Sequence, residues 1–450
     1  MSHYHFIGIG GVSMSGIAMI LKERGHVVTG SDRSRSAATI ELEKAGIKVC
    51  YPQAAENITD DIDTVVYTAA IHDDNPELMS ARQSRARVIE RSVMLGELLS
   101  EYPLPIGVAG THGKTSTSSL LVLIYLAAGL DPTFQIGGTL AATGTNYRIG
   151  HGDSMIIEAC EYSDSFLEFK TKSAVITNIE AEHLDYFKTF DNVKASFRRF
   201  ADLMLPGGTL VTSPELKDLF AGIGSEIVTV SLDKEADVTA KDITPHEGAL
   251  GSSFDLLYKG QNLGRCDLYL PGKHLIYDAL CAAAVALSNG VPFTAVQEGL
   301  AAYRSTKRRF EYRGTLNGAM VIDDYGHHPS EIRATLAAAR EVPAKSLTVV
   351  FQPHTYSRTI DFFDGFVDAL SLADRVILAD IYAAREVDTG VVSSAMIADS
   401  LRAKGKDAIY LPSFEEIEKF LEKNISTGDL LITMGAGDIV NIANDLTRSK

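Results

Sequence analysis

A glycine-rich turn with a lysine and hydroxyl side chains is the most specific chemical signal in the sequence. It reads Gly110-Thr111-His112-Gly113-Lys114-Thr115-Ser116 and lies between a predicted strand over 106–109 and a predicted helix over 120–128. Backbone N–H groups of such a turn bind phosphates, the lysine neutralises their charge and the threonine hydroxyl can ligate magnesium. The upstream glycine is at 107, which departs from a strict P-loop. We predict phosphate binding here; the alternative is a ligand-free turn with an exposed lysine.

Acidic side chains follow two further predicted strands, over 154–157 and 174–177. The carboxyl ends of parallel strands meet at one edge of a sheet, so both sets are expected beside the phosphate turn. A bound nucleoside triphosphate needs hard oxygen ligands for its magnesium. Each residue alone would be an ordinary loop charge, but the set predicts a metal site. Its members are Glu158, Glu161, Glu180, Glu182 and His183.

The N-terminal segment Gly8-Ile9-Gly10-Gly11-Val12-Ser13-Met14-Ser15-Gly16 is similar to a dinucleotide-binding fingerprint. Asp32 follows the next predicted strand, where a ribose-binding carboxylate is expected, although Ser13 replaces the third glycine. The pattern predicts a diphosphate at a helix N-terminus and leaves NAD, FAD and a nucleotide sugar open. An NAD-dependent oxidoreductase would leave the turn at 110–115 unexplained, and a tight turn without ligand is the structural alternative.

Two loops in the last third of the chain are dense in histidine, arginine and aspartate. Asp323-Asp324-Tyr325-Gly326-His327-His328-Pro329 follows a predicted strand over 320–323, and Phe351-Gln352-Pro353-His354-Thr355-Tyr356-Ser357-Arg358 follows the next one. Such side chains at successive strand ends can bind a carboxylate or transfer a proton near neutral pH. One histidine alone would more often be structural, whereas two loops of this composition predict a site.

The elements that position these residues alternate in type. Apolar runs of four to six residues alternate with helical stretches, the pattern of parallel sheets covered on both faces. Two prolines near 102–105 predict a linker, the basic turn at 307–309 precedes a third set of strands, and 228–270 predicts antiparallel additions. We predict an α/β protein with domains over 1–103, 104–311 and 312–450.

Composition excludes several classes of protein. The 450 residues carry a net charge of -16 and are 45% hydrophobic, so the chain is globular, and nucleic acid and anionic membrane are disfavoured partners. Four cysteines without a CxxC pair predict a reducing, cytoplasmic setting. The N-terminus lacks a basic region and the longest apolar stretch, 120–130, is too short for a bilayer, so we expect neither a signal peptide nor a membrane span.

Together these motifs resemble the Mur ligases, the ATP-dependent amide-forming family of peptidoglycan synthesis. The resemblance covers essentially the whole chain and rests on seven blocks in the same order, which is far more specific than any one of them. The blocks are 8–11, 110–115, 158–162, 177–185, 307–311, 323–329 and 351–358.

The resemblance implies a Rossmann-like N-terminal domain for a UDP-sugar, a central P-loop-type ATPase domain with a parallel sheet, and a C-terminal Rossmann-like α/β domain for an amino acid. It assigns the UDP-sugar to Gly10, Gly11, Ser13, Met14, Ser31, Asp32 and Ala70. It assigns ATP to Gly110, Thr111, His112, Gly113, Lys114, Thr115, Ser116, Asn178, His274, Arg309 and Asp324. It assigns Mg²⁺ to Thr115, Glu158 and His183, the amino acid to Tyr325, His327 and Arg358, and catalysis to Lys114, His183, His327 and Arg358. Glu158 is preferred to Glu161 as the metal ligand because it directly follows its strand.

Within the family, the blocks are most similar to the members that join L-alanine to the lactyl carboxylate of UDP-N-acetylmuramate through an acyl phosphate. The alternatives are the related ligase that attaches a recycled tripeptide to the same sugar nucleotide, and a nucleotide-binding regulator without catalysis. The chain departs from the family in the block His274-Leu275-Ile276-Tyr277-Asp278, where two asparagines are usual, and at Thr355, where some members carry arginine. We expect a monomer or homodimer.

Overall fold

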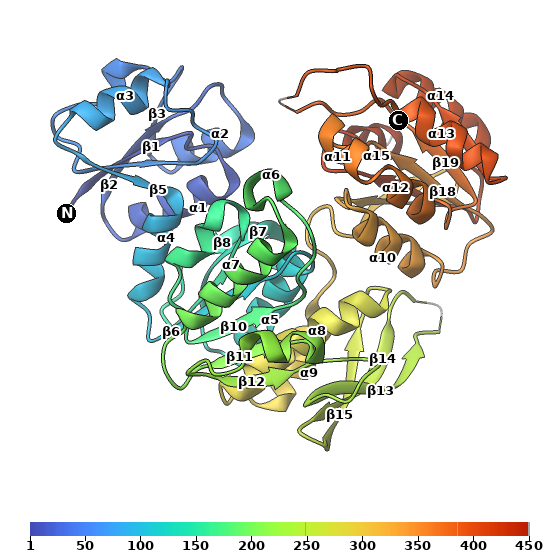
Figure 1. Ribbon diagram of the computed structural model, residues 1–450, viewed down its shortest axis with the longest axis horizontal. Helices are drawn as coiled ribbons and strands as arrows, with labels where there is room; N and C mark the ends of the chain where they lie inside the picture. The colour runs from blue at the N-terminus through green and yellow to red at the C-terminus, as the bar shows by residue number, and fades with distance from the viewer. Residues whose placement is uncertain (248, 385, 449–450) are drawn as a thin grey trace. The chain divides into compact units, whose positions relative to one another are not determined.

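The computed structural model describes residues 1–247, 249–384 and 386–448 of the chain (Figure 1). The chain divides into two compact units. The first comprises Met1–Ile243, Phe254–Asp267 and Tyr277–Tyr303, and the second comprises Thr244–Ser253, Leu268–Ile276 and Arg304–Lys450. The predicted α/β class, with three α/β sheets, is confirmed. No helix in the described ranges has both the length and the apolar character needed to cross a membrane.

The N-terminal sheet is parallel throughout. Its elements are β1 (His3–Ile7), α1 (Val12–Glu23), β2 (Val27–Ser31), α2 (Ala37–Lys44), β3 (Lys48–Cys50), η1 (Ala55–Asn57), β4 (Thr64–Tyr67), α3 (Pro76–Gln83), β5 (Arg87–Glu90) and α4 (Arg91–Ser100). The strand order is β3-β2-β1-β4-β5, and the part is blue in Figure 1. β1 ends at Ile7, because Gly8 turns the chain with φ +82°. This places the fingerprint residues in the loop before α1.

The central sheet surrounds the strand that leads into the phosphate turn. Its elements are β6 (Leu104–Ala109), α5 (Lys114–Ala127), β7 (Thr133–Leu140), β8 (Thr145–Arg148), β9 (Ser154–Glu158), η2 (Tyr162–Glu168), β10 (Ser173–Ile176), α6 (Leu184–Phe187), α7 (Phe190–Asp202), β11 (Thr209–Thr212), η3 (Pro214–Phe220), β12 (Glu226–Thr229), α8 (Lys273–Ser288) and α9 (Phe293–Ala302). The strand order is β12-β11-β10-β6-β9-β7-β8, and the pairing is parallel except between β7 and β8. The loops after β6, β9 and β10 therefore open at one edge, as predicted.

The predicted linker at 102–105 is corrected by the structure. β6 already begins at Leu104, and Pro105 pairs in register with Met155 of β9. The carbonyl of Pro105 accepts from the backbone N–H of Lys172. Proline is tolerated near the start of a strand, where its missing N–H is not needed. One continuous apolar core runs through the N-terminal and central sheets, from Phe6 to Phe220.

The stretch 228–270, for which antiparallel additions are predicted, contributes to two different sheets. β12 completes the edge of the central sheet, and three later strands form a small sheet of their own with the order β13-β14-β15. These strands are β13 (Val238–Pro245), β14 (Ser252–Tyr258) and β15 (Gln261–Leu268).

The C-terminal sheet, orange to red in Figure 1, belongs to the second unit. Its elements are β16 (Glu311–Leu316), β17 (Ala319–Asp324), α10 (Pro329–Ala339), β18 (Leu347–Phe351), α11 (Tyr356–Asp361), α12 (Phe363–Leu370), β19 (Arg375–Leu378), α13 (Ser394–Ala403), β20 (Asp407–Tyr410), α14 (Phe414–Asn424), β21 (Leu430–Met434) and α15 (Val440–Thr447). The order is β16-β17-β21-β18-β19-β20, with only β16 antiparallel to its neighbour. The strand predicted over 320–323 lies within β17, the strand predicted before the second histidine-containing loop is β18, and β16 and β20 lie at the edges of the sheet.

Candidate active site

The phosphate turn connects β6 to α5 through two glycines. Gly110 has φ +134° and Gly113 has φ +81°, conformations that residues with a side chain rarely adopt. Gly113 is the N-cap of α5 and no side chain caps this helix within the described structure. The N–H groups at the start of α5 therefore face the phosphate turn. An anion bound there is stabilised by these groups and by the helix dipole.

The loop after β10 fixes the shape of the turn. The N–H of His112 donates to Asn178 Oδ1 at 2.9 Å, and Asn178 Nδ2 donates back to the carbonyl of His112 at 3.1 Å. Thr177 Oγ1 donates to the same carbonyl at 2.6 Å, and Glu180 N donates to Thr111 Oγ1 at 2.9 Å. Asn178 thus supports the turn from a neighbouring strand end.

Lys114 is buried and paired with a carboxylate. Its ammonium lies 3.1 Å from Glu161 Oε2 and donates to the carbonyls of Gly110 and Thr111 at 2.5 and 2.9 Å. The two side chains are only 15% and 3% exposed. Burial lowers the pKa of Lys114, but the negative charge of Glu161 outweighs it, so the pKa lies well above its ordinary value. Lys114 therefore carries a fixed positive charge at the turn.

Thr115 and Glu158 form a second contact at the same edge. Thr115 Oγ1 donates to Glu158 Oε2 at 2.8 Å, and the N–H of Gly137 donates to the same oxygen at 2.8 Å. A Cβ atom at Gly137 would lie 2.5 Å from the Glu158 carboxylate, so only glycine leaves room for this approach. The hydroxyl predicted as a metal ligand and its predicted carboxylate partner therefore lie together.

A third set of polar atoms comes from the loops after β9 and β10. Ligand atoms of Glu161, Glu182 and His183 all lie within 4.8 Å of one another. His183 has φ +56°, and its Nε2 is 3.8 Å from Glu161 Oε1. Carboxylate and hydroxyl oxygens are hard donors of the kind that Mg²⁺ prefers, so this edge of the sheet fits a magnesium ion. Of the residues predicted for this edge, Glu161, Glu182 and His183 lie together.

Helix α8 packs behind the phosphate turn. A Cβ atom at Gly113 would lie 2.6 Å from Asp278 Oδ1, and Asp278 is 4% exposed. Tyr277 Oη donates to the carbonyl of Thr177 at 2.8 Å. The block that departs from the family therefore touches both the turn and its supporting loop. Sequence reasoning assigned no role to Asp278, whose only signal was its position in that block.

The fingerprint loop closes around Asp32. The N–H of Gly10 donates to Asp32 Oδ2 at 2.8 Å, and a Cβ atom at Gly10 would lie 2.8 Å from that oxygen. Gly11 is the N-cap of α1 without a side-chain cap in the described structure. Ser13 Oγ donates to Gln135 Oε1 of β7 at 3.2 Å. The predicted loop residues thus surround one helix N-terminus.

The other predicted UDP-sugar residues differ in accessibility. Met14 is 2% exposed and Ser31 is fully buried, with its hydroxyl donating to Glu77 Oε2 at 2.6 Å. Ala70 is exposed and its N–H lies 3.4 Å from Thr68 Oγ1. The side chain of Ser31 therefore faces the interior of the domain.

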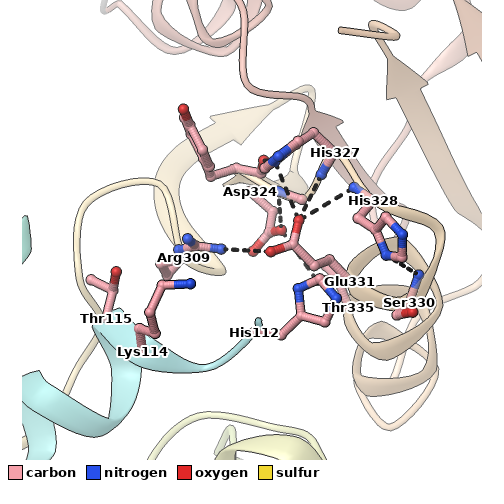
Figure 2. Close-up of polar contacts among 12 residues, drawn as sticks. His112, Lys114, Thr115, Arg309, Asp324, His327, His328, Ser330, Glu331 and Thr335 are labelled. Atoms are coloured by element: carbon pink, nitrogen blue, oxygen red, sulfur yellow. Dashed lines mark hydrogen bonds and ion pairs between the residues drawn. The ribbon is translucent and has the colours of Figure 1, made fainter. Parts of the chain in front are cut away.

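In the second unit, Asp324 organises the start of the loop after β17 (Figure 2). Its Oδ1 accepts from Gly326 N at 2.8 Å and Thr335 Oγ1 at 3.1 Å, and its Oδ2 accepts from Phe310 N at 2.8 Å. Burial raises the pKa of Asp324, and the positive charge of Arg309 opposes that rise. Arg309 points to Glu331, with 3.7 Å between Nη1 and Oε1.

Four side chains of the loops after β17 and β18 lie near one another. The His327 and His354 rings are 6.0 Å apart, and Arg358 Nη1 lies 3.2 Å from His354 Nδ1. His327 also lies beside Tyr325, with 5.4 Å between the rings. Burial, and then the charges of His327 and Arg358, lower the pKa of His354 to about 4. His354 is therefore neutral at physiological pH, although the sequence analysis assigned it no individual role.

His274 belongs to the second unit and lies beside Gly272. Its Cε1 lies 2.7 Å from where a Cβ of that glycine would be. Burial lowers the pKa of His274 to about 4, and the charge of Arg309 acts in the same direction. A neutral imidazole can both donate and accept a hydrogen bond.

Family models match almost the entire chain. The Mur ligase family catalytic domain matches residues 3–103, the Mur ligase middle domain matches 108–286, and the Mur ligase glutamate ligase domain matches 308–437. The chain belongs to the Mur ligase family. The resemblance inferred from the seven sequence blocks is thereby confirmed.

Two curated relatives of this Mur ligase align along nearly their whole length. The UDP-N-acetylmuramate--L-alanine ligase of Agathobacter rectalis is 47% identical, covering 99% of this chain and 98% of the relative. The UDP-N-acetylmuramate--L-alanine ligase of Caldanaerobacter subterraneus is 45% identical, covering 97% and 95%.

Solved structures of the family share the architecture. The UDP-N-acetylmuramate-alanine ligase of Thermotoga maritima has a TM-score of 0.83 at 29% identity, covering 99% of this Mur ligase and 98% of that chain. A murein peptide ligase of Psychrobacter arcticus has a TM-score of 0.70 at 24% identity, with 99% and 98% covered. The second likeness concerns the fold alone.

Proposed function

We propose that this Mur ligase joins L-alanine to the lactyl carboxylate of UDP-N-acetylmuramate, with ATP as the phosphoryl donor, in the synthesis of peptidoglycan precursors. The observation that carries the proposal is the turn at 110–115, where buried Lys114 pairs with Glu161 beside Thr115 and Glu158. That geometry suits phosphoryl transfer, and the full-length relatives named above act on UDP-N-acetylmuramate and L-alanine.

In the first step, an oxygen of the lactyl carboxylate attacks the γ-phosphorus of ATP. A carboxylate–phosphorus bond forms, the bond to the bridging oxygen breaks, and ADP leaves. Lys114 and the N–H groups of the turn stabilise the negative charge of the transferred group, which is an electrostatic and positioning task. Gly110, Thr111, His112, Gly113 and Ser116 shape this site, with Asn178, His274, Arg309 and Asp324 as further proposed ATP residues.

Magnesium fits the donors at the edge of the central sheet. We assign it to Thr115, Glu158 and His183, of which Thr115 contacts Glu158, whereas His183 lies with Glu161 and Glu182. When bound, Mg²⁺ supplies positive charge to the phosphate oxygens. His183 and the carboxylates then hold that charge beside the turn, while Lys114 remains cationic because Glu161 lies against it.

In the second step, the amine of L-alanine attacks the acyl carbon, the amide bond forms and inorganic phosphate leaves. The guanidinium of Arg358 suits the alanine carboxylate, because its planar fork can bind both oxygens. His327 is assigned to accept the proton that the amine loses, and Tyr325 completes the amino-acid site. Exclusion of water protects the acyl phosphate from hydrolysis.

The fingerprint loop is assigned to the UDP-sugar through Gly10, Gly11, Ser13, Met14, Asp32 and Ala70, with Ser31 behind it. We keep the domain limits 1–103, 104–311 and 312–450 for the UDP-sugar, ATP and amino-acid domains. The proposed cytoplasmic setting agrees with the four free cysteines at 50, 160, 266 and 281, and a monomer or homodimer is part of the proposal.

Phosphate release from ATP tests the proposal. The purified protein is supplied with UDP-N-acetylmuramate and assayed with L-alanine, with the recycled tripeptide, or with neither. Release that depends on L-alanine supports the proposal, and Lys114→Ala should abolish it. Release that depends on the tripeptide instead would assign the chain to the recycling ligase, and no release with all co-substrates would refute ligase activity.

A further inference from the structure

We propose that Glu77 is a positioning residue for the UDP-sugar: its buried carboxylate fixes the strand end that carries Ser31 and Asp32. The inference rests on the proposed function, because it concerns how the fingerprint loop, the proposed UDP-sugar site, is held in place. Glu77 belongs to α3 in the N-terminal part of the chain (Figure 1) and lies outside every motif of the sequence analysis.

One carboxylate joins four segments of the domain. Glu77 Oε1 lies 2.6 Å from His5 Nε2 in β1, and Glu77 Oε2 accepts from Ser31 Oγ at the end of β2, also at 2.6 Å. The same Oε2 accepts from the N–H of Ala54 at 3.2 Å. Glu77 is fully buried and His5 is 1% exposed. These contacts hold β1, β2 and the loop after β3 to the start of α3.

The start of α3 suits a buried negative charge. Asn75 is the N-cap, and its Oδ1 accepts from the N–H groups of Glu77 and Leu78 at 3.0 and 3.1 Å. Glu77 is in the first turn, where the helix dipole stabilises a carboxylate. The Asn75 amide also donates to Gln53 Oε1 at 2.9 Å, which ties the adjacent loop to the same helix end.

The contact between Glu77 and Ser31 leads directly to the fingerprint loop, which is proposed to bind the UDP-sugar. The carbonyl of Ser31 accepts from the N–H groups of Gly8 and Ile9, both at 2.9 Å. The next residue, Asp32, accepts from the N–H of Gly10 through its side chain at 2.8 Å. A displacement of Ser31 would therefore move both the glycine turn and the carboxylate that closes on it.

A second branch of the hydrogen-bond network leads away from that loop. His5 Nδ1 lies 2.8 Å from Thr29 Oγ1, which is 2.9 Å from His3 Nε2, and His3 Nδ1 lies 3.0 Å from exposed Asp61. A buried polar network is a poor source of stability compared with an apolar core, so its value here is conformational specificity. His3 offers a matched control, since it belongs to the same network without touching Ser31.

The test measures KM for UDP-N-acetylmuramate, KM for ATP and kcat in the full-length protein. In Glu77→Leu we expect KM for the UDP-sugar to rise at least about 10-fold, the cost of one charged hydrogen bond, with KM for ATP and kcat within about 2-fold. Ser31→Ala should raise the same KM by about 3-fold, because it removes only the hydroxyl contact. Glu77→Gln should stay near wild type, since an amide can accept from Ser31 and donate to the other tautomer of His5. His3→Gln should leave all three constants unchanged.

An unchanged KM for the UDP-sugar in Glu77→Leu, or a fall in kcat alone together with a lower melting temperature, would overturn the inference in favour of a purely structural role. If Glu77→Leu does not fold, Ser31→Ala decides: an unchanged KM there refutes the inference. The two levels of the proposal fail differently. A wild-type protein that releases no phosphate refutes the proposed function, whereas an active wild type with unmoved KM values in the variants refutes only the role of Glu77.

Discussion

Lys114 and Glu161 form a buried ion pair that joins the phosphate turn to the loop after β9, with 3.1 Å between the ammonium and the carboxylate. The residues are 47 positions apart in the sequence, and the parallel pairing of β6 with β9 brings them together. The pair keeps Lys114 charged, and Glu161 also lies 3.8 Å from His183. Glu161 therefore links the lysine to the proposed metal donors.

Replacing Glu161 with glutamine should reduce phosphate release about 100-fold. The change leaves the buried ammonium of Lys114 without its partner charge, which costs about 3 kcal/mol. The measurement is kcat/KM for ATP at saturating UDP-sugar and L-alanine. Glu168→Gln, an exposed change on the following segment, is the matched control and should be neutral. Wild-type rates in Glu161→Gln would remove the ion pair from the mechanism.

Thr115→Ala should weaken the use of magnesium-ATP selectively. The variant loses the hydroxyl that donates to Glu158, so KM for magnesium-ATP should rise about 10-fold. Binding of UDP-N-acetylmuramate, measured by calorimetry, should not change, because its proposed loop lies on another sheet. Thr115→Ser keeps the hydroxyl and should restore the ATP constant. Equal loss of both ligands would contradict separate sites.

Local patterns predicted most of the fold and the turn at 110–115. Apolar runs identify buried strands such as β10 and β18, whose residues are nearly all inaccessible to water. The edge strands β16 and β20 escaped prediction because each carries exposed or half-buried residues that break the apolar run. Pro105 contributed to the wrong prediction of a linker. A proline near the start of a strand costs no hydrogen bond, so β6 includes it.

Contacts between distant segments could not be predicted from local patterns. The sequence placed Glu158 and Glu161 at one strand end, but only the register decides that Thr115 contacts the first and Lys114 the second. Nothing near Glu77 signals that it faces His5, 72 positions away. These pairings depend on side-chain direction across the sheet, which a motif does not encode.

Thr355→Gly should stabilise the protein. Thr355 has φ +66° and ψ +147°, a region that only glycine occupies without strain, and such strain costs about 1 to 3 kcal/mol. Glycine also adds freedom to the unfolded chain, which offsets about 1 kcal/mol, so a net gain of about 1 kcal/mol is expected in urea unfolding. Thr355→Ala keeps a Cβ atom and serves as the control, with no gain expected. A less stable glycine variant would show that the backbone is not strained there.

The stability of the protein should fall in acid partly through His274. Its pKa is about 4 in the folded state, lowered by burial and by Arg309, against 6.5 in the unfolded chain. The unfolded state therefore binds the proton first, so the contribution of neutral His274 is complete above pH 6.5 and is lost as the pH falls towards 4. Over this window the free energy of unfolding changes through His274 by at most about 1.4 kcal/mol per pH unit.

His274→Gln isolates this contribution, because glutamine does not titrate. The free energy of unfolding is measured for both proteins at pH 7.5, 6.0, 5.0 and 4.5, and the difference between them cancels other groups such as His354, whose pKa is also lowered to about 4. We expect wild type to lose stability faster than His274→Gln below about pH 6.5, since only wild type must exclude that proton. A difference that stays constant from pH 7.5 to 4.5 would mean that His274 titrates alike in the folded and unfolded chain.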